Sequence, residues 1–185
     1  MKTQKNVNFD QEFLKALQQD SRKAGRRLYD RYSGYVMAIC LRYLSDADAA
    51  ADALQDTFVK ILTRIDRFEY RGEDSLKAWI GKIAANEALM RLKSRPLIFT
   101  DHLPDAIEEP EEPDVGKVPL DVLYQMIGDL PACYRAVFNL YVFEQQSHHE
   151  IARQLNISEG TSASQLLRAK RQLARKIKEY IKKNE

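Results

Sequence analysis

Apolar residues recur every three or four positions over long stretches of the chain, and this spacing constrains the fold more than any other feature of the sequence. One stripe of this kind runs through Ala47, Ala51, Leu54, Phe58, Ile61, Leu62 and Ile65. A second stripe runs through Leu76, Trp79, Ile80, Ile83 and Met90. With only seven glycines and six prolines among 185 residues, turn signals for a sheet are few. The sequence therefore predicts an all-α protein.

Short signals mark where the helices begin and end. Helices are predicted near residues 9–19 and 22–44, after Ser45, after Ser75, and in the segments LDVLYQMIGDL and PACYRAVFNLYVFE. Ser45 followed by Asp48 has the spacing of a capping box, and Pro131 suits the first turn of a helix. Pro96 disfavours helix at the residue before it, so the helix that follows Ser75 is expected to end there.

Prolines and acids are concentrated in the segment LIFTDHLPDAIEEPEEPDVGKVP. Five of the six prolines fall between residues 96 and 119, and eight acids against Lys117 occur between Asp101 and Asp121. A segment of this composition cannot bury enough apolar surface to offset the entropy lost on ordering. The sequence predicts two small helical domains, residues 1–95 and 119–185, joined by an acidic, Pro-rich linker at 96–118.

Charge is segregated along the chain although the net charge is only +2. Eight Lys and Arg residues follow Ser158, which makes the C-terminal end basic. Cys40 and Cys133 lie in apolar helical patterns without the spacing of a zinc site, which favours buried free thiols. The chain starts without the apolar run of a signal peptide and has no transmembrane stretch. We therefore expect a protein of the reducing cytosol, without membrane insertion.

The segment SHHEIARQLNISEGTSASQLLRAKRQLARKI, residues 147–177, has the pattern of a helix-turn-helix. Ser147 and Glu150 have capping-box spacing at the start of the first helix. Asn156 suits a left-handed turn after that helix, and Ser158 suits the cap of the second. The second helix of such a motif commonly lies in the major groove of DNA.

That second helix has two contrasting sides at 100° per residue. The apolar side holds Leu166, Ala169, Leu173 and Ile177. The opposite side, predicted to face outward, holds Ser164, Arg168, Arg171 and Arg175. A small residue near the helix start lets the helix approach base edges, and the arginines behind it suit phosphates. This side favours DNA binding; a solvated basic face on a helical bundle is the alternative.

Enzymatic chemistry has little support in the sequence. In HHEIAR, Arg153 stands where a zinc protease motif needs its second histidine, so His148 and His149 are predicted to be surface residues. No Gly-rich phosphate loop and no nucleophile arrangement with Ser, Cys or His is evident. We expect neither an enzyme nor a cofactor or metal site.

Three segments together resemble the bacterial sigma factors of the extracytoplasmic-function group. Leu28 to Arg95 is similar to region 2 of this family, and Leu130 to Leu173 to its region 4. The segments are LYDRYSGYVMAICLRYLSDADAAADALQDTFVKILTRIDRF, LKAWIGKIAANEALMRLKSR and LPACYRAVFNLYVFEQQSHHEIARQLNISEGTSASQLLRAKRQL. The resemblance implies a subunit that binds RNA polymerase core, directs it to promoter DNA and helps to open the duplex.

For region 4, the resemblance implies that the helix-turn-helix reads the minus-thirty-five element. The implied DNA-binding residues are Thr161, Ser164, Gln165, Arg168, Arg171 and Arg175. Family members often carry basic residues at the positions of Ala163 and Gln165 and a branched apolar residue at that of Ser162. The loss of two cations predicts weaker phosphate anchoring and an altered base preference.

For region 2, the segment DALQDTF resembles the part of the family that docks on a basic coiled coil of the largest polymerase subunit. This implies a core-binding role for Asp52, Gln55 and Asp56; by itself the pattern is also that of a solvated helix face. Phe58 matches the segment too, but its spacing predicts that it packs inside.

The loop FEYRGEDS resembles the part of region 2 that captures an unpaired base of the minus-ten element. Tyr70 could stack on that base and Arg71 could bond its edge; a plain surface turn at Gly72 is the alternative. Trp79 is predicted to belong to the core. The cations and amide expected to follow the phosphate backbone are Lys82, Asn86, Arg91, Lys93 and Arg95, with burial against the preceding helix as the alternative for Asn86.

The predicted function is thus an alternative sigma factor of the cytoplasm, with core polymerase and promoter DNA as partners. Many members of this family are also held inactive by an anti-sigma partner. Two other classes stay open: a helix-turn-helix regulator that acts without polymerase core, and a helical scaffold or anti-sigma binding module.

Overall fold

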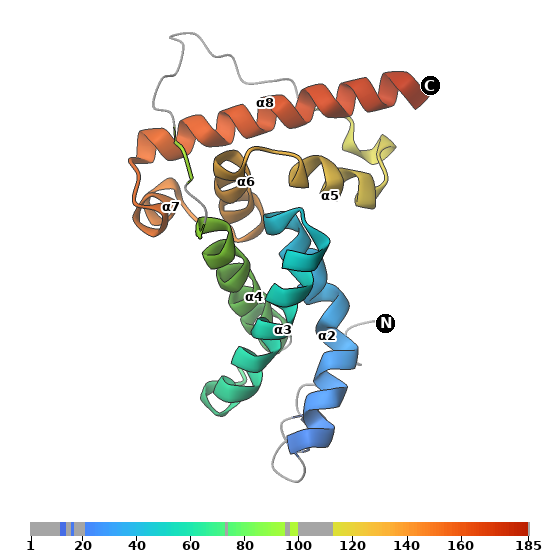
Figure 1. The fold of residues 1–185 in the computed structure, drawn as a ribbon, viewed down its shortest axis with the longest axis vertical. Helices are drawn as coiled ribbons and strands as arrows, with labels where there is room; N and C mark the ends of the chain where they lie inside the picture. The colour runs from blue at the N-terminus through green and yellow to red at the C-terminus, as the bar shows by residue number, and fades with distance from the viewer. Residues whose placement is uncertain are drawn as a thin grey trace. The chain divides into compact units, whose positions relative to one another are not determined.

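The computed structural model describes residues 12–13, 16, 21–72, 74–94, 97–99 and 113–184. Every element in these ranges is helical and none is a strand, so the all-α prediction is confirmed (Figure 1). The elements are α2 (Ser21–Leu44), α3 (Ala47–Arg64), η1 (Ile65–Arg67), α4 (Ser75–Lys93), η2 (Val115–Lys117), α5 (Leu120–Gly128), α6 (Ala132–Phe138), η3 (Asn139–Phe143), α7 (His148–Leu155) and α8 (Glu159–Asn184). Of the helix expected near residues 9–19, only residues 12, 13 and 16 are described, and they are helical. Most of the predicted linker lies outside the described residues.

The chain divides into two compact units. The first contains the residues up to Cys40 and those from Asp46 to Met90, and the second contains Leu41–Ser45 and all residues from Arg91 onward. Of the helices in the described part of the chain, none is long and apolar enough to cross a membrane.

In the first unit, the core is formed by apolar residues from α2, α3 and α4. The largest fully buried ones are Leu28, Val36, Ile61, Leu76 and Ile80. The buried side of α3 is rotated about the helix axis from the side that the sequence predicted. It includes Ala50, Ala53 and Thr57, and the Thr57 hydroxyl donates to the Ala53 carbonyl at 2.6 Å. Alanine and threonine contribute little to an apolar periodicity, so the sequence did not indicate that this side is buried.

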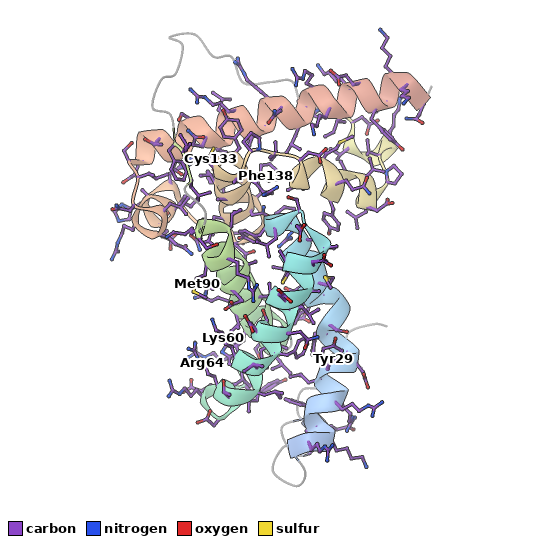
Figure 2. The ribbon with its side chains drawn as sticks, viewed as in Figure 1. Tyr29, Lys60, Arg64, Met90, Cys133 and Phe138 are labelled. Carbon is purple, nitrogen blue, oxygen red and sulfur yellow. The ribbon has the colours of Figure 1, made fainter. Side chains whose placement is uncertain are left out.

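Several expectations about these helices are therefore wrong. Ala47 and Ala51 are exposed, Leu62 is 43% exposed, and Met90 is 55% exposed and points outward from α4 (Figure 2). The cap of α3 is Asp46, not Ser45. The Asp46 carboxylate accepts a hydrogen bond of 2.7 Å from the Ala49 amide, while Ser45 takes a left-handed conformation with φ 53°.

A charged pair joins α3 to α4 in the first unit. Glu87 is 3% exposed, and its carboxylate accepts a hydrogen bond from the Lys60 ammonium group, which is itself half-buried. A buried carboxylate needs such a partner because its desolvation is costly. The pair therefore adds a polar contact to the apolar packing of the two helices.

In the second unit, one apolar cluster lies between α5 and α8, and further apolar residues are buried on α6 and α7. The buried cluster comprises Val118, Met126, Ile127, Leu130, Ala169, Leu173 and Ile177. Val118, which the sequence assigns to the end of the linker, is thus a core residue at 7% exposure. Pro131 precedes α6 as its N-cap residue and does not occupy its first turn.

Buried polar groups bind the segment Leu41–Ser45 into the second unit. The Asn139 amide, fully buried, donates to the carbonyls of Arg42 at 3.1 Å and Arg135 at 2.9 Å. The Arg135 guanidinium donates to the Ser45 hydroxyl and to the Gly128 carbonyl, and burial lowers its pKa. The sequence contains no periodic signal for these contacts.

Both cysteines are free thiols, as expected. Cys40 is buried, whereas Cys133 on α6 is half-buried. Burial raises the pKa of the Cys133 thiol above its ordinary value.

Candidate nucleic-acid interface

The helices α7 and α8 form the predicted helix-turn-helix, and each predicted signal between them is present. The Ser147 hydroxyl accepts from the Glu150 amide at 3.3 Å, and the Glu150 carboxylate accepts from the Ser147 amide at 2.8 Å, which completes the capping box. Asn156 ends α7 with φ 57° and ψ 52°. The Ser158 hydroxyl then accepts from the Thr161 amide at 2.9 Å in the first turn of α8.

Two histidines link the beginnings of α7 and α8. The His148 ring stacks on Tyr141 with centroids 4.8 Å apart, and its Nδ1 lies 2.9 Å from the hydroxyl of the buried Ser162. The Nδ1 atom of His149 lies 2.9 Å from the Glu159 carboxylate. Sequence reasoning predicted only that these histidines lie at the surface; His149 is exposed and His148 is half-buried. Their contacts therefore connect the two helices at their first turns.

The first turns of α8 are more buried than predicted. Thr161 is 7%, Ser164 2% and Gln165 0% exposed. The expectation that Ser164 faces outward is wrong for this structure. Its hydroxyl donates back to the Thr161 carbonyl at 2.8 Å, which satisfies a small polar side chain without water. Ala163, between these residues, is exposed.

The arginines of α8 become more accessible toward its C-terminus. Arg168 and Arg171 are half-buried, and Arg175 is exposed, with its Nε 3.8 Å from the Glu179 carboxylate. Surface pairs of this kind contribute little free energy because water screens them. The cationic side predicted for this helix is therefore open to solvent at Arg175.

In the first unit, the loop after η1 is held in a defined turn. The Ser75 hydroxyl donates to the Gly72 carbonyl at 2.7 Å and accepts from the Arg71 amide at 3.3 Å. Gly72 has φ 109°, a conformation that side chains rarely adopt. The guanidinium of Arg71 lies 3.0 Å from the Glu69 carboxylate and is exposed, whereas Tyr70 is half-buried.

A cavity of about 470 Å³ lies beside this loop. It is lined by Arg67, Phe68, Glu69, Arg71, Ser75, Ala78 and Trp79. The rings of Phe68 and Trp79 form a tilted pair with centroids 5.4 Å apart. A cavity with an aromatic wall and polar groups at its rim has the size and chemistry to hold a planar ring. Of the two loop residues predicted to contact a base, Arg71 lines this cavity and Tyr70 does not.

Trp79 is the residue that sequence reasoning missed at this site. Its place on the apolar stripe predicted a core residue, but the side chain is half-buried and lines the cavity. A tryptophan is large enough to pack one edge inside and leave a face accessible. Its position four residues after the loop, about one helical turn into α4, was the signal available in the sequence.

On α4, three predicted contact residues, Lys82, Asn86 and Lys93, are exposed, and Arg91 is half-buried. The alternative that Asn86 is buried against another helix is wrong. Lys93 donates to the Gln154 carbonyl of α7 at 2.9 Å, within the second unit. Arg95 lies outside the described residues.

On α3, Asp52, Gln55 and Asp56 are exposed together. Beside them Val59 is 60% exposed, although Phe58, one residue earlier, is 5% exposed as its spacing predicted. The surface thus combines carboxylates with an apolar side chain, a composition suited to a basic protein partner.

Comparison with known proteins agrees with this arrangement. Residues 28–96 match Sigma-70 region 2, and residues 120–173 match Sigma-70, region 4. The RNA polymerase sigma-H factor of Pseudomonas aeruginosa is 25% identical over 94% of this chain and 96% of its own length. The ECF RNA polymerase sigma-E factor of Haemophilus influenzae is 28% identical over 91% of this chain and 95% of its own.

Among solved structures, the chain is similar to the sigma factor RpoE crystallised with the anti-sigma factor NepR from Bartonella quintana. The identity is 25% and the TM-score 0.46, with 80% of this chain and 92% of that chain covered. The two sigma-70 regions occur in the expected order and together span well over half of the residues. The chain belongs to the sigma-70 family of RNA polymerase sigma factors, in its extracytoplasmic-function (ECF) group.

Proposed function

We propose that this protein is an alternative sigma factor that binds RNA polymerase core and directs promoter recognition, DNA melting and transcription initiation. The observation that carries the proposal is the presence of both sigma-70 regions in one chain, one with a helix-turn-helix and one with an aromatic cavity. A regulator that acts without polymerase needs only the first of these.

In this proposal, the first unit supplies the contact with core polymerase. The exposed surface of Asp52, Gln55, Asp56 and Val59 on α3 binds the basic coiled coil of the largest subunit. Carboxylates favour a basic partner and speed its association, and the valine adds apolar contact.

The cavity beside the loop holds one base of the minus-ten element after it leaves the duplex. Trp79 and Phe68 supply stacking, while Arg71 and Glu69 lie at the rim, where they can bond the base edge. Stacking is worth about 1–3 kcal/mol per base, comparable to the few kcal/mol that unstacking costs. Base capture thus favours strand opening without hydrolysis of a nucleotide. Lys82 and Asn86 bind the adjacent phosphates.

The second unit reads the minus-thirty-five element with the first turns of α8, and its arginines bind phosphates. The polymerase performs the chemistry, and this chain contributes binding and no catalytic residue. Because its partners are the polymerase and chromosomal DNA, the protein acts in the cytoplasm. An anti-sigma factor that covers these surfaces would hold it inactive.

Reconstituted transcription tests the proposal. Genomic fragments bound by the purified protein with core polymerase are selected, sequenced and used as templates for run-off transcription. The protein with core should give discrete transcripts, and core alone should give none. Replacing Asp52 and Asp56 by Asn should weaken core binding, whereas Asp30→Asn, an exposed acid on α2, is the matched control. Promoter binding without any affinity for core would instead identify a conventional regulator.

A further inference from the structure

The helix α8 continues well beyond the part that matches sigma-70 region 4. The match ends at residue 173, whereas α8 extends from Glu159 to Asn184. The extension is anchored on its apolar side: Ile177 is 5% exposed in the core cluster, and Tyr180 and Ile181 pack against the same cluster. In Figure 1, this part of α8 runs along α5. The extension is therefore a fixed part of the second unit.

Cations on the extension continue the polar side of the helix. At 3.6 residues per turn, five cations fall within an arc of about 80°. They are Arg168, Arg171, Arg175, Lys178 and Lys182. The last three are exposed. Ser164 lies within the same arc, so the stripe is in line with the turns proposed to read bases.

The first turns of α8 contain no cation. From Glu159 to Leu167 there is neither Lys nor Arg, and Glu159 adds a negative charge. Protein affinity for duplex DNA comes largely from cations that neutralise phosphates. The contacts by which this helix neutralises phosphate charge must therefore come from its later turns.

Groove dimensions place the extension over the backbone. The 26 residues of α8 are about 39 Å long at 1.5 Å per residue, while the major groove is about 12 Å wide. With its first turns in the groove, a helix of this length passes beyond the groove edge. Lys178 and Lys182 lie roughly 20 Å or more from Ser164 along the axis, too far to share its bases.

We infer that Lys178 and Lys182 form a second DNA-contacting segment, which binds the phosphate backbone flanking the element that the first turns of α8 read. The inference rests on the proposed function. The extension supplies cations that the start of the helix lacks. Its contacts add affinity without sequence preference, because phosphates carry no base information.

The test measures how promoter binding by the holoenzyme depends on salt. For each phosphate that a variant no longer neutralises, the slope of log K against log[salt] falls by about 0.9 in magnitude. The variant Lys178→Gln/Lys182→Gln should lower the slope by roughly 2 and weaken binding equally on promoters with intact and altered minus-thirty-five sequences. Lys178→Arg/Lys182→Arg should retain the parental slope.

Lys183→Gln is the control for the change at Lys182 in the double variant. Lys183 is the next residue, is also exposed, and lies about 100° around the helix from Lys182. Its replacement should leave the slope unchanged. Thermal unfolding of each variant checks that the anchored extension is intact.

The outcomes separate the inference from the proposed function. If the parental holoenzyme transcribes from its promoter but all variants share its slope, the extension does not bind DNA and the function stands. If Lys178→Gln/Lys182→Gln weakens binding to core instead, the extension contacts polymerase and the inference is overturned. If the parental protein does not bind core, the proposed function itself fails.

Discussion

At position 156, the backbone conformation restricts the choice of residue as much as side-chain chemistry does. Asn156 ends α7 in the left-handed region, which allows the chain to turn directly into α8. The amide of Ile157 then donates to the Ala152 carbonyl at 3.0 Å and closes the end of the helix. The turn between α7 and α8 therefore depends on a residue that tolerates this conformation.

Replacing Asn156 tests this requirement. Asn156→Ala should lower the free energy of unfolding by about 1 kcal/mol, because a Cβ is strained in the left-handed region without the local bonds of an Asn side chain. Asn156→Gly should cost little, since glycine adopts this region freely. Urea denaturation measures both. Equal losses for the two variants would mean that the Asn side chain, not the backbone conformation, is what matters.

Trp79 is the residue on which base capture should depend most. Trp79→Ala should reduce open-complex formation by about 5- to 150-fold, the equivalent of one stacked base at roughly 1–3 kcal/mol. Trp79→Phe should retain most of the activity, because it keeps an aromatic face beside Phe68. Fluorescence of 2-aminopurine in the minus-ten element reports opening, and binding to core checks the fold. If the alanine variant opens promoters normally, the cavity does not hold a base.

At the scale of elements, helix pairs in this protein are joined by polar contacts as well as by apolar stripes. The stripes of α3 and α4 explain that the helices pack, but not which residues of each meet. The Lys60–Glu87 pair adds this selectivity, since a buried carboxylate is stabilised where a cation reaches it.

A double-mutant cycle measures the value of this pair. Lys60→Met should destabilise the protein by about 2 kcal/mol, because it removes a cation from a carboxylate that is 3% exposed, while the half-exposed lysine limits the effect. Adding Glu87→Leu to this variant should restore part of the loss, since no charge then stays buried. Chemical denaturation gives the four free energies. Strictly additive losses would show that the two side chains do not interact.

At the scale of the whole molecule, the burial found at the start of α8 conflicts with the base-reading role proposed for that part of the helix. Thr161, Ser164 and Gln165 are buried in the structure, yet the proposed function needs the start of α8 to reach base edges. The proposed base reading therefore predicts a population shift that exposes these residues once the protein has bound core polymerase, before it meets the promoter.

Thiol labelling detects such a shift. In a protein lacking its native cysteines, Ser164→Cys should react with a maleimide much more slowly than Ala163→Cys, because position 164 is buried and position 163 exposed. On binding to core polymerase, before DNA is added, the two rates should converge. A cysteine at 164 that stays unreactive in the holoenzyme would exclude Ser164 from base reading.

The sequence by itself determined the local organisation of this protein. The period of the apolar residues predicted the helices, the caps at Ser147, Asn156 and Ser158 predicted the helix-turn-helix, and the order of the segments predicted the family. These features depend on residues only a few positions apart in the sequence, so the local sequence predicts them.

Only the tertiary structure decided which sides of the helices are buried by other parts of the chain. It exposed Leu62 and Met90, placed Trp79 at a cavity, buried the start of α8, and paired Lys60 with Glu87. The burial of a side chain depends on which distant parts of the sequence pack against its helix. A periodic pattern predicts the direction of the side chain but not the residues that it contacts. The polar contacts that select one packing arrangement for these helices are therefore visible only in three dimensions.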